Sequence, residues 1–236
     1  MAIHRAGWLV AMLACAIACG RAAPAPAGNE DVTRAASDDG TYHGRPIAQT
    51  CSYLGAAWLE RPDRAEREQP ERVLDALHLD PASTAADVGA GTGYFALRLT
   101  RRVAKVYATD LQPEMLERLQ DNVSRAQLGN VASILAGEHD ARLPPRCCDL
   151  VLLVDVYHEL SDPAAIMAGI RRALTEHGRL VLIEYRGEDP AVAIKPEHKM
   201  TLPRIRDELT GLGFVFVESL ELLPDQRVVI FTGGAR

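Results

Sequence analysis

Short apolar segments alternate with longer amphipathic segments along most of this 236-residue chain, and this alternation constrains its fold most strongly. Between most of the short apolar segments, the apolar residues recur at the spacing of a helix face. In 113–123, for example, Met115 and Leu119 share one face. Strands that alternate with helices predict a mostly parallel, doubly wound α/β sheet. The expected strands are 84–88, 103–109, 131–136, 150–154, 179–185, 214–220 and 228–231.

The connection between the last two expected strands is unusually short. Only a few residues, among them Glu221 to Gln226, separate 214–220 from 228–231. A parallel crossover needs about a dozen residues or more, so these two strands must be antiparallel. We therefore predict a seven-stranded sheet in which the last strand is antiparallel.

Length and charge limit the classes of partner. A chain of 236 residues can bury one good core and carry appendages. Its formal charge is −6, and no run of lysines and arginines is interleaved with aromatic residues. We therefore expect no nucleic-acid partner.

The N-terminus is organised like an export signal. Arg5 precedes an apolar run over 8–18, which is too short to span a bilayer, and small residues lead to Cys19. The end of the run, AIACG, resembles a bacterial lipobox, which implies lipidation of Cys19 after cleavage. Ala16 stands where that motif prefers leucine, and cleavage before Cys15 is an alternative. The other interpretations are an ordinary cleaved signal and a start codon that has been assigned too far upstream.

The chain therefore divides into four expected parts. Residues 1–18 form the signal peptide, 19–41 a flexible Ala- and Pro-rich linker, 42–80 an N-terminal helical segment and 81–236 the main domain. We expect one or two helices over 47–79. The expected location is the membrane, facing the periplasm, with the cytoplasm as the alternative.

The cysteines outside the signal segment are Cys51, Cys147 and Cys148. Adjacent cysteines seldom bridge each other, and no residues have zinc-ligand spacing. We therefore expect neither a disulfide framework nor a metal site.

The stretch DVGAGTG (87–93) places three glycines at the end of the first expected strand. Parallel sheets bind ligands at that edge, and glycine permits positive φ and close approach of a ligand. A dinucleotide fingerprint, G-x-G-x-x-G, would need glycine where Tyr94 stands. Asp87 would oppose a pyrophosphate but could bind a cationic amino group.

This stretch resembles motif I of the class I S-adenosylmethionine-dependent methyltransferases, and the likeness is strongest over 84–186. The resemblance implies a Rossmann-like methyltransferase fold and S-adenosyl-L-methionine as cofactor. Asp110 is similar to the acidic residue that binds both ribose hydroxyls, and Leu111 to the apolar residue under the adenine. The other cofactor-binding residues implied by motif I are Asp87, Gly89, Ala90, Gly91 and Gly93.

The resemblance continues after the third and fourth expected strands. The loop 136–144 is similar to the one whose carboxylate binds the adenine amino group; Asp140 is our choice, with Glu138 and His139 as alternatives. Asp155 is expected near the methionine portion of the cofactor. His158 is a candidate general base for a hydroxyl or thiol acceptor; the alternative is that it packs under the cofactor or caps the next turn.

The segments 44–68, 154–163 and 184–200 together resemble a bacterial methyltransferase-like group of unassigned substrate. His198 or Lys199 is expected either to contact substrate or to lie on the surface. The tetrapeptide N-P-P-Y of many amino-directed enzymes is absent after the fourth strand, which favours an oxygen, sulfur or carbon acceptor on a small molecule. The alternative is a non-catalytic cofactor-binding sensor or a membrane-tethered scaffold. A membrane contact is expected only through the N-terminal lipid, and the oligomeric state is not predicted.

Overall fold

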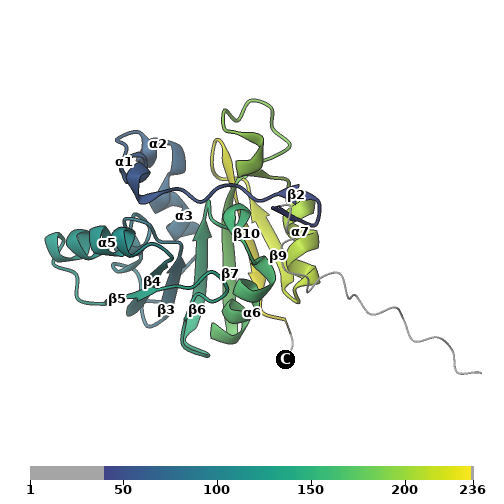
Figure 1. Ribbon diagram of the computed structural model, residues 1–236. Helices are drawn as coiled ribbons and strands as arrows, with labels where there is room; N and C mark the ends of the chain where they lie inside the picture. Colours follow the sequence, from purple (N-terminus) through teal and green to yellow (C-terminus); the bar gives the residue numbers. More distant parts are fainter. Residues whose placement is uncertain (1–39, 235–236) are drawn as a thin grey trace, which may run out of the picture.

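The computed structural model describes residues 40–234 and centres on one β-sheet with helices on both faces (Figure 1). The expected signal peptide, Cys19 and the linker up to residue 39 lie outside these residues. Among residues 40–234, every helix is too short or too polar to span a bilayer.

Seven strands form the main path of the sheet, in the spatial order β5-β4-β3-β6-β7-β10-β9. A two-residue strand, β8 (Lys199–Met200), pairs with β7 beside this path. The bounds of the seven are β3 Thr84–Val88, β4 Lys105–Asp110, β5 Val131–Leu135, β6 Cys148–Val154, β7 Leu174–Arg186, β9 Val215–Leu220 and β10 Gln226–Thr232.

The direction of the strands matches the sequence-based prediction. Strands β3 to β7 pair in parallel, whereas β10 is antiparallel to both of its neighbours, β7 and β9. The predicted doubly wound sheet with an antiparallel last strand is therefore confirmed. From β3 the chain winds outward through β4 and β5, and then returns to β6 on the other side of β3. The carboxyl ends of β3 and β6 thus flank the switch point where such sheets bind ligands.

Prolines and side-chain caps begin several of the helices. Pro113 and Pro163 occupy first-turn positions, and the side chains of Asp162 and Thr201 cap the last two helices. The helices are α1 Ala56–Leu59, α2 Arg64–Glu68, α3 Pro70–Ala76, α4 Ala96–Leu99, α5 Pro113–Arg125, α6 Pro163–Ala173 and α7 Leu202–Gly211. The 3₁₀ turns are η1 Tyr53–Gly55, η2 Tyr157–Glu159 and η3 Pro196–His198.

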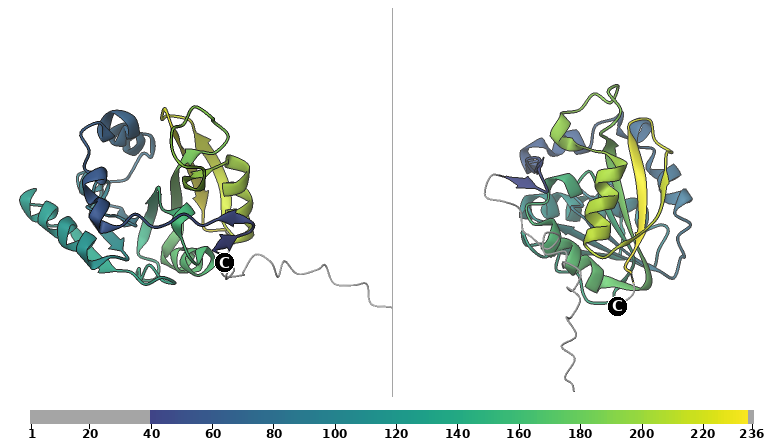
Figure 2. Two further views of the ribbon diagram at one scale, coloured as in Figure 1. Left: turned by 45° about the horizontal axis from the view of Figure 1, so that its top comes forward. Right: turned by 90° about the vertical axis from the view of Figure 1, so that its right-hand side faces the viewer.

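The sheet is buried on both faces, as Figure 2 shows from two further directions. In β6, Leu150 and Leu152 pack into a core shared with α3, α4 and α5. Val151 and Leu153 point to the opposite core, shared with α6 and α7. Each fully buried leucine stabilises the fold by about 1.5–3 kcal/mol. This two-sided burial explains why the strand is apolar throughout.

Two helix boundaries differ from the expected ones. The one or two helices expected over 47–79 are divided into short pieces, because Gln69 adopts a left-handed conformation (φ 39°) and Pro70 begins a new helix. The sequence also predicts a helix that begins at Asp162 and Pro163 and stops near Gly178. Helix α6 instead ends at Ala173, because Leu174 is extended and begins β7.

The N-terminal segment crosses the carboxyl edge of the sheet after the short hairpin of β1 (Thr41–Tyr42) and β2 (Arg45–Pro46) (Figure 1). The backbone N–H of Ala48 donates to the carbonyl of His158 at 3.1 Å. The Arg45 guanidinium donates to the same carbonyl and forms a buried ion pair with Glu208. These contacts hold the segment beside the loop after β6.

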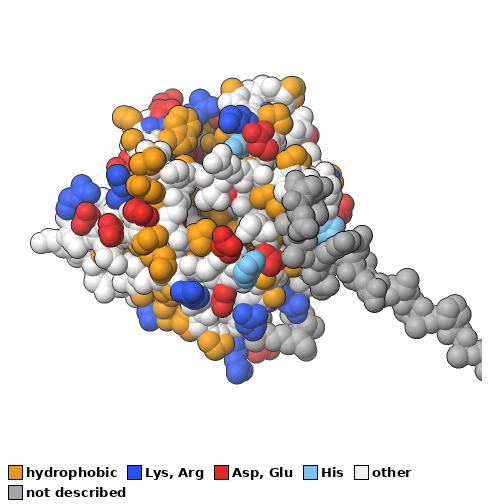
Figure 3. All heavy atoms as spheres, viewed as in Figure 1, with side chains coloured by type: hydrophobic (Ala, Val, Ile, Leu, Met, Phe, Trp, Pro, Cys, Tyr) orange, Lys and Arg blue, Asp and Glu red, His pale blue; other side chains and the backbone are white. Residues whose placement is uncertain are grey.

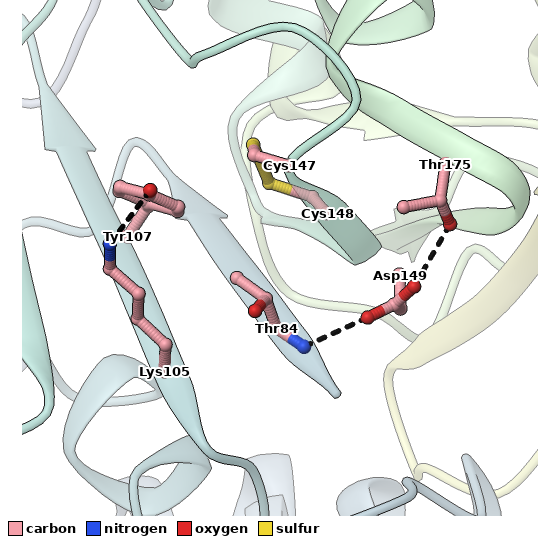
Figure 4. The surroundings of a disulfide bond; sticks show 7 residues. All are labelled: Thr84, Lys105, Tyr107, Cys147, Cys148, Asp149 and Thr175. Carbon is pink, nitrogen blue, oxygen red and sulfur yellow. Dashed lines mark hydrogen bonds between the residues drawn. A yellow bond between two sulfur atoms is a disulfide. The ribbon is translucent and has the colours of Figure 1, made fainter. Parts of the chain in front are cut away.

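A disulfide joins Cys147 to its neighbour Cys148 (Figure 4). This contradicts the expectation that the two thiols stay unbridged, which came from the rarity of bridges between adjacent residues. Asp149, the next residue, accepts hydrogen bonds from the backbone of Thr84 and the hydroxyl of Thr175. The disulfide lies at the start of β6, at the end of the strand opposite to the switch-point edge.

Candidate functional site

A cavity of about 400 Å³ opens at the carboxyl ends of β3, β4, β6 and β7. Ligand pockets in proteins commonly have volumes of about 300–1,000 Å³. The face seen in Figure 3 is hollowed, and basic side chains there are interspersed with acidic ones. Residues on the cavity wall include Val88, Gly89, Ala90, Gly91, Asp110, Leu111, Gln112, Glu138, Asp155, His158, Glu159, Tyr185 and His198.

The three glycines have different functions in the loop after β3. All three have positive φ. A Cβ on Gly89 would lie 2.5 Å from the Val156 side chain, and one on Gly93 would lie 2.6 Å from Leu97. These two glycines therefore permit close packing, and Gly93 does not line the cavity. Gly91 lines it, and a Cβ there would meet only Leu59 within 4 Å.

Asp110 connects the glycine loop to the end of β4. One of its carboxylate oxygens accepts from the backbone N–H of Gly91 at 2.8 Å and the other from Gln112 at 2.9 Å. Burial raises the pKa of Asp110, although these backbone hydrogen bonds oppose the shift. Each oxygen keeps a further lone pair that can accept a hydroxyl. The neighbouring Leu111 is 42% exposed and presents an apolar surface at the cavity wall.

Asp87 is a buried carboxyl group on the cavity wall, only 3% exposed. Burial raises its pKa to about 7, while a backbone hydrogen bond from Ala96 and the charge of Arg64 lower it. A group in this state is stabilised by a cation that enters the cavity. Arg64 itself is buried and paired with Glu68 at 2.8 Å, so its charge is already compensated.

Asp155 follows β6 and has a positive φ of 53°, which is uncommon for a residue other than glycine. The side-chain amide of Gln226 donates to both of its oxygens, at 3.0 and 2.8 Å. Burial, followed by the charges of Glu184 and Glu68, raises the pKa of Asp155 well above its usual value. This carboxyl group therefore lines the cavity in a fixed orientation.

His158 lies beside Asp155 and is 2% exposed. Its Nδ1 is 2.5 Å from Oε2 of Glu184, and its Nε2 is 3.1 Å from Nδ1 of His198. Burial alone would lower the pKa of His158, but the charge and hydrogen bond of Glu184 outweigh it and raise the pKa. Glu159 completes this group, and burial raises its pKa to about 7.

The structure separates the candidates in the loop after β5. Asp140 does not line the cavity; its Oδ1 accepts from the backbone of Arg142 and closes a local turn. His139 is exposed and pairs with Asp162. Glu138, the remaining alternative, is the carboxylate of this loop that reaches the cavity wall.

Two glutamines that contact residues of the cavity wall or the segment beside it carried no sequence signal. The side chain of Gln112 bridges the N-terminal segment, because it accepts from the backbone of Tyr53 and donates to the carbonyl of Cys51, both at 2.8 Å. Gln226 reaches Asp155 from β10, 71 residues away. Only the folded arrangement brings these residues to their partners. The Arg64–Glu68 pair is different, because the charge run over 61–72 places the two residues at helical spacing and could have suggested it.

Comparison with known proteins assigns the central part of the chain. A family model described as a methyltransferase domain matches residues 86–182. An uncharacterized methyltransferase of Mycobacterium bovis is 33% identical over 121 residues, which are 51% of this chain and 47% of the relative. The ribosomal protein L11 methyltransferase of Thermus thermophilus is 30% identical over 139 residues, 59% of this chain and 48% of the relative. The chain thus spans about half the length of these curated relatives.

Solved structures extend the comparison to the fold. A SAM-dependent methyltransferase from Aquifex aeolicus has a TM-score of 0.73 and 26% identity, covering 77% of this chain and 98% of that one. The [4+2]-cyclase SpnF, at 20% identity and a TM-score of 0.57, shares the fold alone. The predicted Rossmann-like methyltransferase fold is confirmed, and the matches imply S-adenosylmethionine as the cofactor.

Proposed function

Because this chain carries a domain of the class I S-adenosylmethionine-dependent methyltransferase family, we propose that it transfers the cofactor's methyl group to a small-molecule acceptor. The acceptor atom is oxygen, sulfur or carbon rather than nitrogen. Bound S-adenosylmethionine would supply a methyl group on a sulfonium: the acceptor atom would bond to that carbon as the carbon–sulfur bond breaks, with S-adenosylhomocysteine as the leaving group. The chain's own residues must hold the cofactor, align the acceptor and exclude water.

The hydrogen bond between Gly91 and Asp110 is the observation that carries this proposal. It places a carboxylate with free lone pairs beside a loop whose glycine leaves the cavity open. Two acceptor oxygens suit the two hydroxyl donors of a ribose. The hydrogen bond between the backbone N–H of Gly91 and the Asp110 carboxylate fixes both groups, which supports a ribose subsite that needs little reorganisation.

The cavity wall also has groups that suit the methionine end and the adenine end of the cofactor. The buried carboxyl of Asp87 suits the ammonium of the methionine portion, because a cation there offsets the cost of burying a charge. Leu111 offers an apolar surface to the adenine, and Glu138 offers an acceptor for its amino group. The sequence favoured Asp140 as that acceptor. Its carboxylate instead closes a local turn and lies off the cavity wall, so we prefer Glu138.

The residues on the acceptor side of the cavity are consistent with a small-molecule acceptor. Asp155-Val156-Tyr157-His158 replaces the N-P-P-Y pattern after β6. The wall there includes the apolar Leu160 and Ile194 and the polar His158. Glu184 holds Nδ1 of His158, so Nε2 is the nitrogen that can accept a proton or bind another group. The general-base role of His158 stays a prediction, and it requires that no other group occupies Nε2.

Export to the periplasmic face, through lipidation of Cys19, is proposed from the sequence alone.

The alternative function, a non-catalytic cofactor sensor or tethered scaffold, has one supporting observation: the fold is shared by the [4+2]-cyclase SpnF, so fold and function are separable. Absence of turnover in the presence of tight cofactor binding would favour this alternative.

Calorimetry of the full chain with S-adenosylmethionine and S-adenosylhomocysteine tests the proposal first. Both should bind, and NAD should not, because Asp87 would oppose a pyrophosphate. Incubation with labelled cofactor and a set of small hydroxyl, thiol and carbon acceptors then tests transfer. Tight binding of NAD, or no binding of either S-adenosyl compound, would refute the proposed function.

A further inference from the structure

Three side chains with metal-binding atoms converge on the acceptor side of the cavity. His158 and Glu159 belong to η2, which follows β6, and His198 ends η3, which precedes β8. Nε2 of His158 is 3.1 Å from Nδ1 of His198. Oε1 of Glu159 is 3.9 Å from the first nitrogen and 4.0 Å from the second.

Neighbouring groups hold these side chains in their orientations. Glu184, fully buried, binds Nδ1 of His158 and also accepts from the backbone of Tyr157 at 2.9 Å. A carboxylate on one imidazole nitrogen makes the other nitrogen the free acceptor, as is usual for histidines that bind metals. The second oxygen of Glu159 accepts from the backbone N–H of Cys51 at 3.3 Å, which leaves Oε1 facing the histidines.

The local charge favours a cation. Among the ion pairs of residues 40–234, Glu159 pairs only with His158 and His198, and Glu184 only with His158. No described lysine or arginine compensates either carboxylate by an ion pair. Two carboxylates held in a largely buried group of this kind are stabilised when a positive ion enters.

The distances match those around a transition metal. A point equidistant from the three atoms lies about 2.1–2.2 Å from each, and Zn²⁺ bonds measure ~2.0–2.1 Å to histidine nitrogen and ~2.0–2.2 Å to carboxylate oxygen. Two histidines and one carboxylate are also a ligand set that leaves a position open. A direct hydrogen bond between the two imidazoles is the competing explanation of the 3.1 Å distance.

We propose that His158, Glu159 and His198 bind one divalent transition metal ion of the Zn²⁺ class, with an open coordination position that takes the oxygen or sulfur of the acceptor. Metal binding itself is independent of the proposed function; only the assignment of the open position to an acceptor rests on it. The three residues are not recognisable from the sequence as one group, because His198 lies 40 residues beyond His158.

The probe is Co²⁺, because it binds in the same sites as Zn²⁺ and, unlike Zn²⁺, absorbs visible light. The full chain, made without a polyhistidine tag and stripped with a chelator, is titrated with Co²⁺ and then with competing Zn²⁺. We expect one equivalent per chain and visible absorption bands that Zn²⁺ removes. Glu159→Gln and His198→Ala should each weaken binding at least about tenfold. His139→Ala is the matched control, because that exposed histidine pairs with Asp162 outside the cavity, and it should bind as the wild type does.

Thermal melts and S-adenosylmethionine calorimetry on every variant separate misfolding from loss of the metal. Binding that persists in both ligand variants, or no stoichiometric binding by the wild type, overturns the metal site. If the wild type binds metal but not S-adenosylmethionine, the proposed function falls while the metal site stands. Addition of a small thiol to the Co²⁺ form should add a sulfur-to-metal charge-transfer band, and its absence overturns the open position.

Discussion

The backbone N–H of Gly91 donates a 2.8 Å hydrogen bond to Oδ2 of Asp110, and this bond joins the loop after β3 to the end of β4. Gln112 binds the other oxygen of the same carboxylate. Asp110 is therefore held at both oxygens before a ligand enters. Because little ordering remains to be done, we expect the ribose of the proposed cofactor to bind here at a low entropic cost.

Asp110→Ala should weaken S-adenosylmethionine binding by about 1.5–3 kcal/mol, roughly 10- to 150-fold, because two hydroxyls lose a charged acceptor. Calorimetry at constant pH measures the change. Asp121→Ala, an exposed carboxylate on α5, is the matched control and should leave the affinity unchanged. Equal affinities of wild type and Asp110→Ala would remove Asp110 from the ribose subsite.

The parts of this fold that could be predicted from the sequence are those with local causes. The strand and helix periods, the short connection before β10 and the glycines after β3 each depend on residues close together in the chain. The break at Gln69 was not predictable from helical spacing, because a single left-handed residue ends α2 while the apolar pattern continues into α3.

The acceptor side of the cavity was largely out of reach of sequence reasoning. His158 was identified from the sequence, but its 2.5 Å contact with Glu184 depends on the pairing of β6 with β7. His198 joins them because β8, which follows it directly, pairs with the end of β7. Likewise, Cys51 meets Glu159 because the N-terminal segment crosses that edge.

Gly91→Val should weaken S-adenosylmethionine binding at least about tenfold while the domain stays folded. A valine at φ 54° costs about 1–2 kcal/mol of strain, and its Cβ would lie 2.8 Å from the Leu59 side chain at the cavity wall. Circular dichroism and calorimetry measure folding and affinity on the same sample.

The control for Gly91→Val is Gly129→Val. Nothing lies within 4 Å of a Cβ at Gly129, and this residue does not have a positive φ. The control should bind the cofactor normally. If Gly91→Val also bound it normally, the open space at Gly91 would be unrelated to the ligand.

Cys19→Ser tests the proposed export. The wild-type chain should fractionate with membranes and incorporate labelled fatty acid, because a diacylated cysteine anchors a protein stably. The variant should be unprocessed or released in soluble form and should lose the label. A wild-type chain found only in the cytosolic fraction, with no label, would contradict the export proposal.

Asp87→Asn should change the pH dependence of stability. The Asp87 carboxyl has a usual pKa of 3.8, which burial raises to about 7 in the folded chain. Between these values the folded state holds a proton that the unfolded state has lost, so this group makes stability fall as pH rises from about 4 to about 7. A shift of this size corresponds to roughly 4 kcal/mol. Asparagine removes that cost, so the variant should melt at a higher temperature than wild type at pH 8 without cofactor.

The same substitution should have the opposite effect on cofactor binding. If the ammonium of S-adenosylmethionine lies beside Asp87, the complex favours the ionised carboxylate, and wild-type affinity should rise as pH increases from about 5 to about 7. Asp87→Asn should bind more weakly and lose most of that rise. Other carboxyls of the cavity, Glu159 among them, also have raised pKa values, so the difference between variant and wild type is the quantity to compare. Affinities that rise equally with pH in both proteins would place the ammonium away from Asp87.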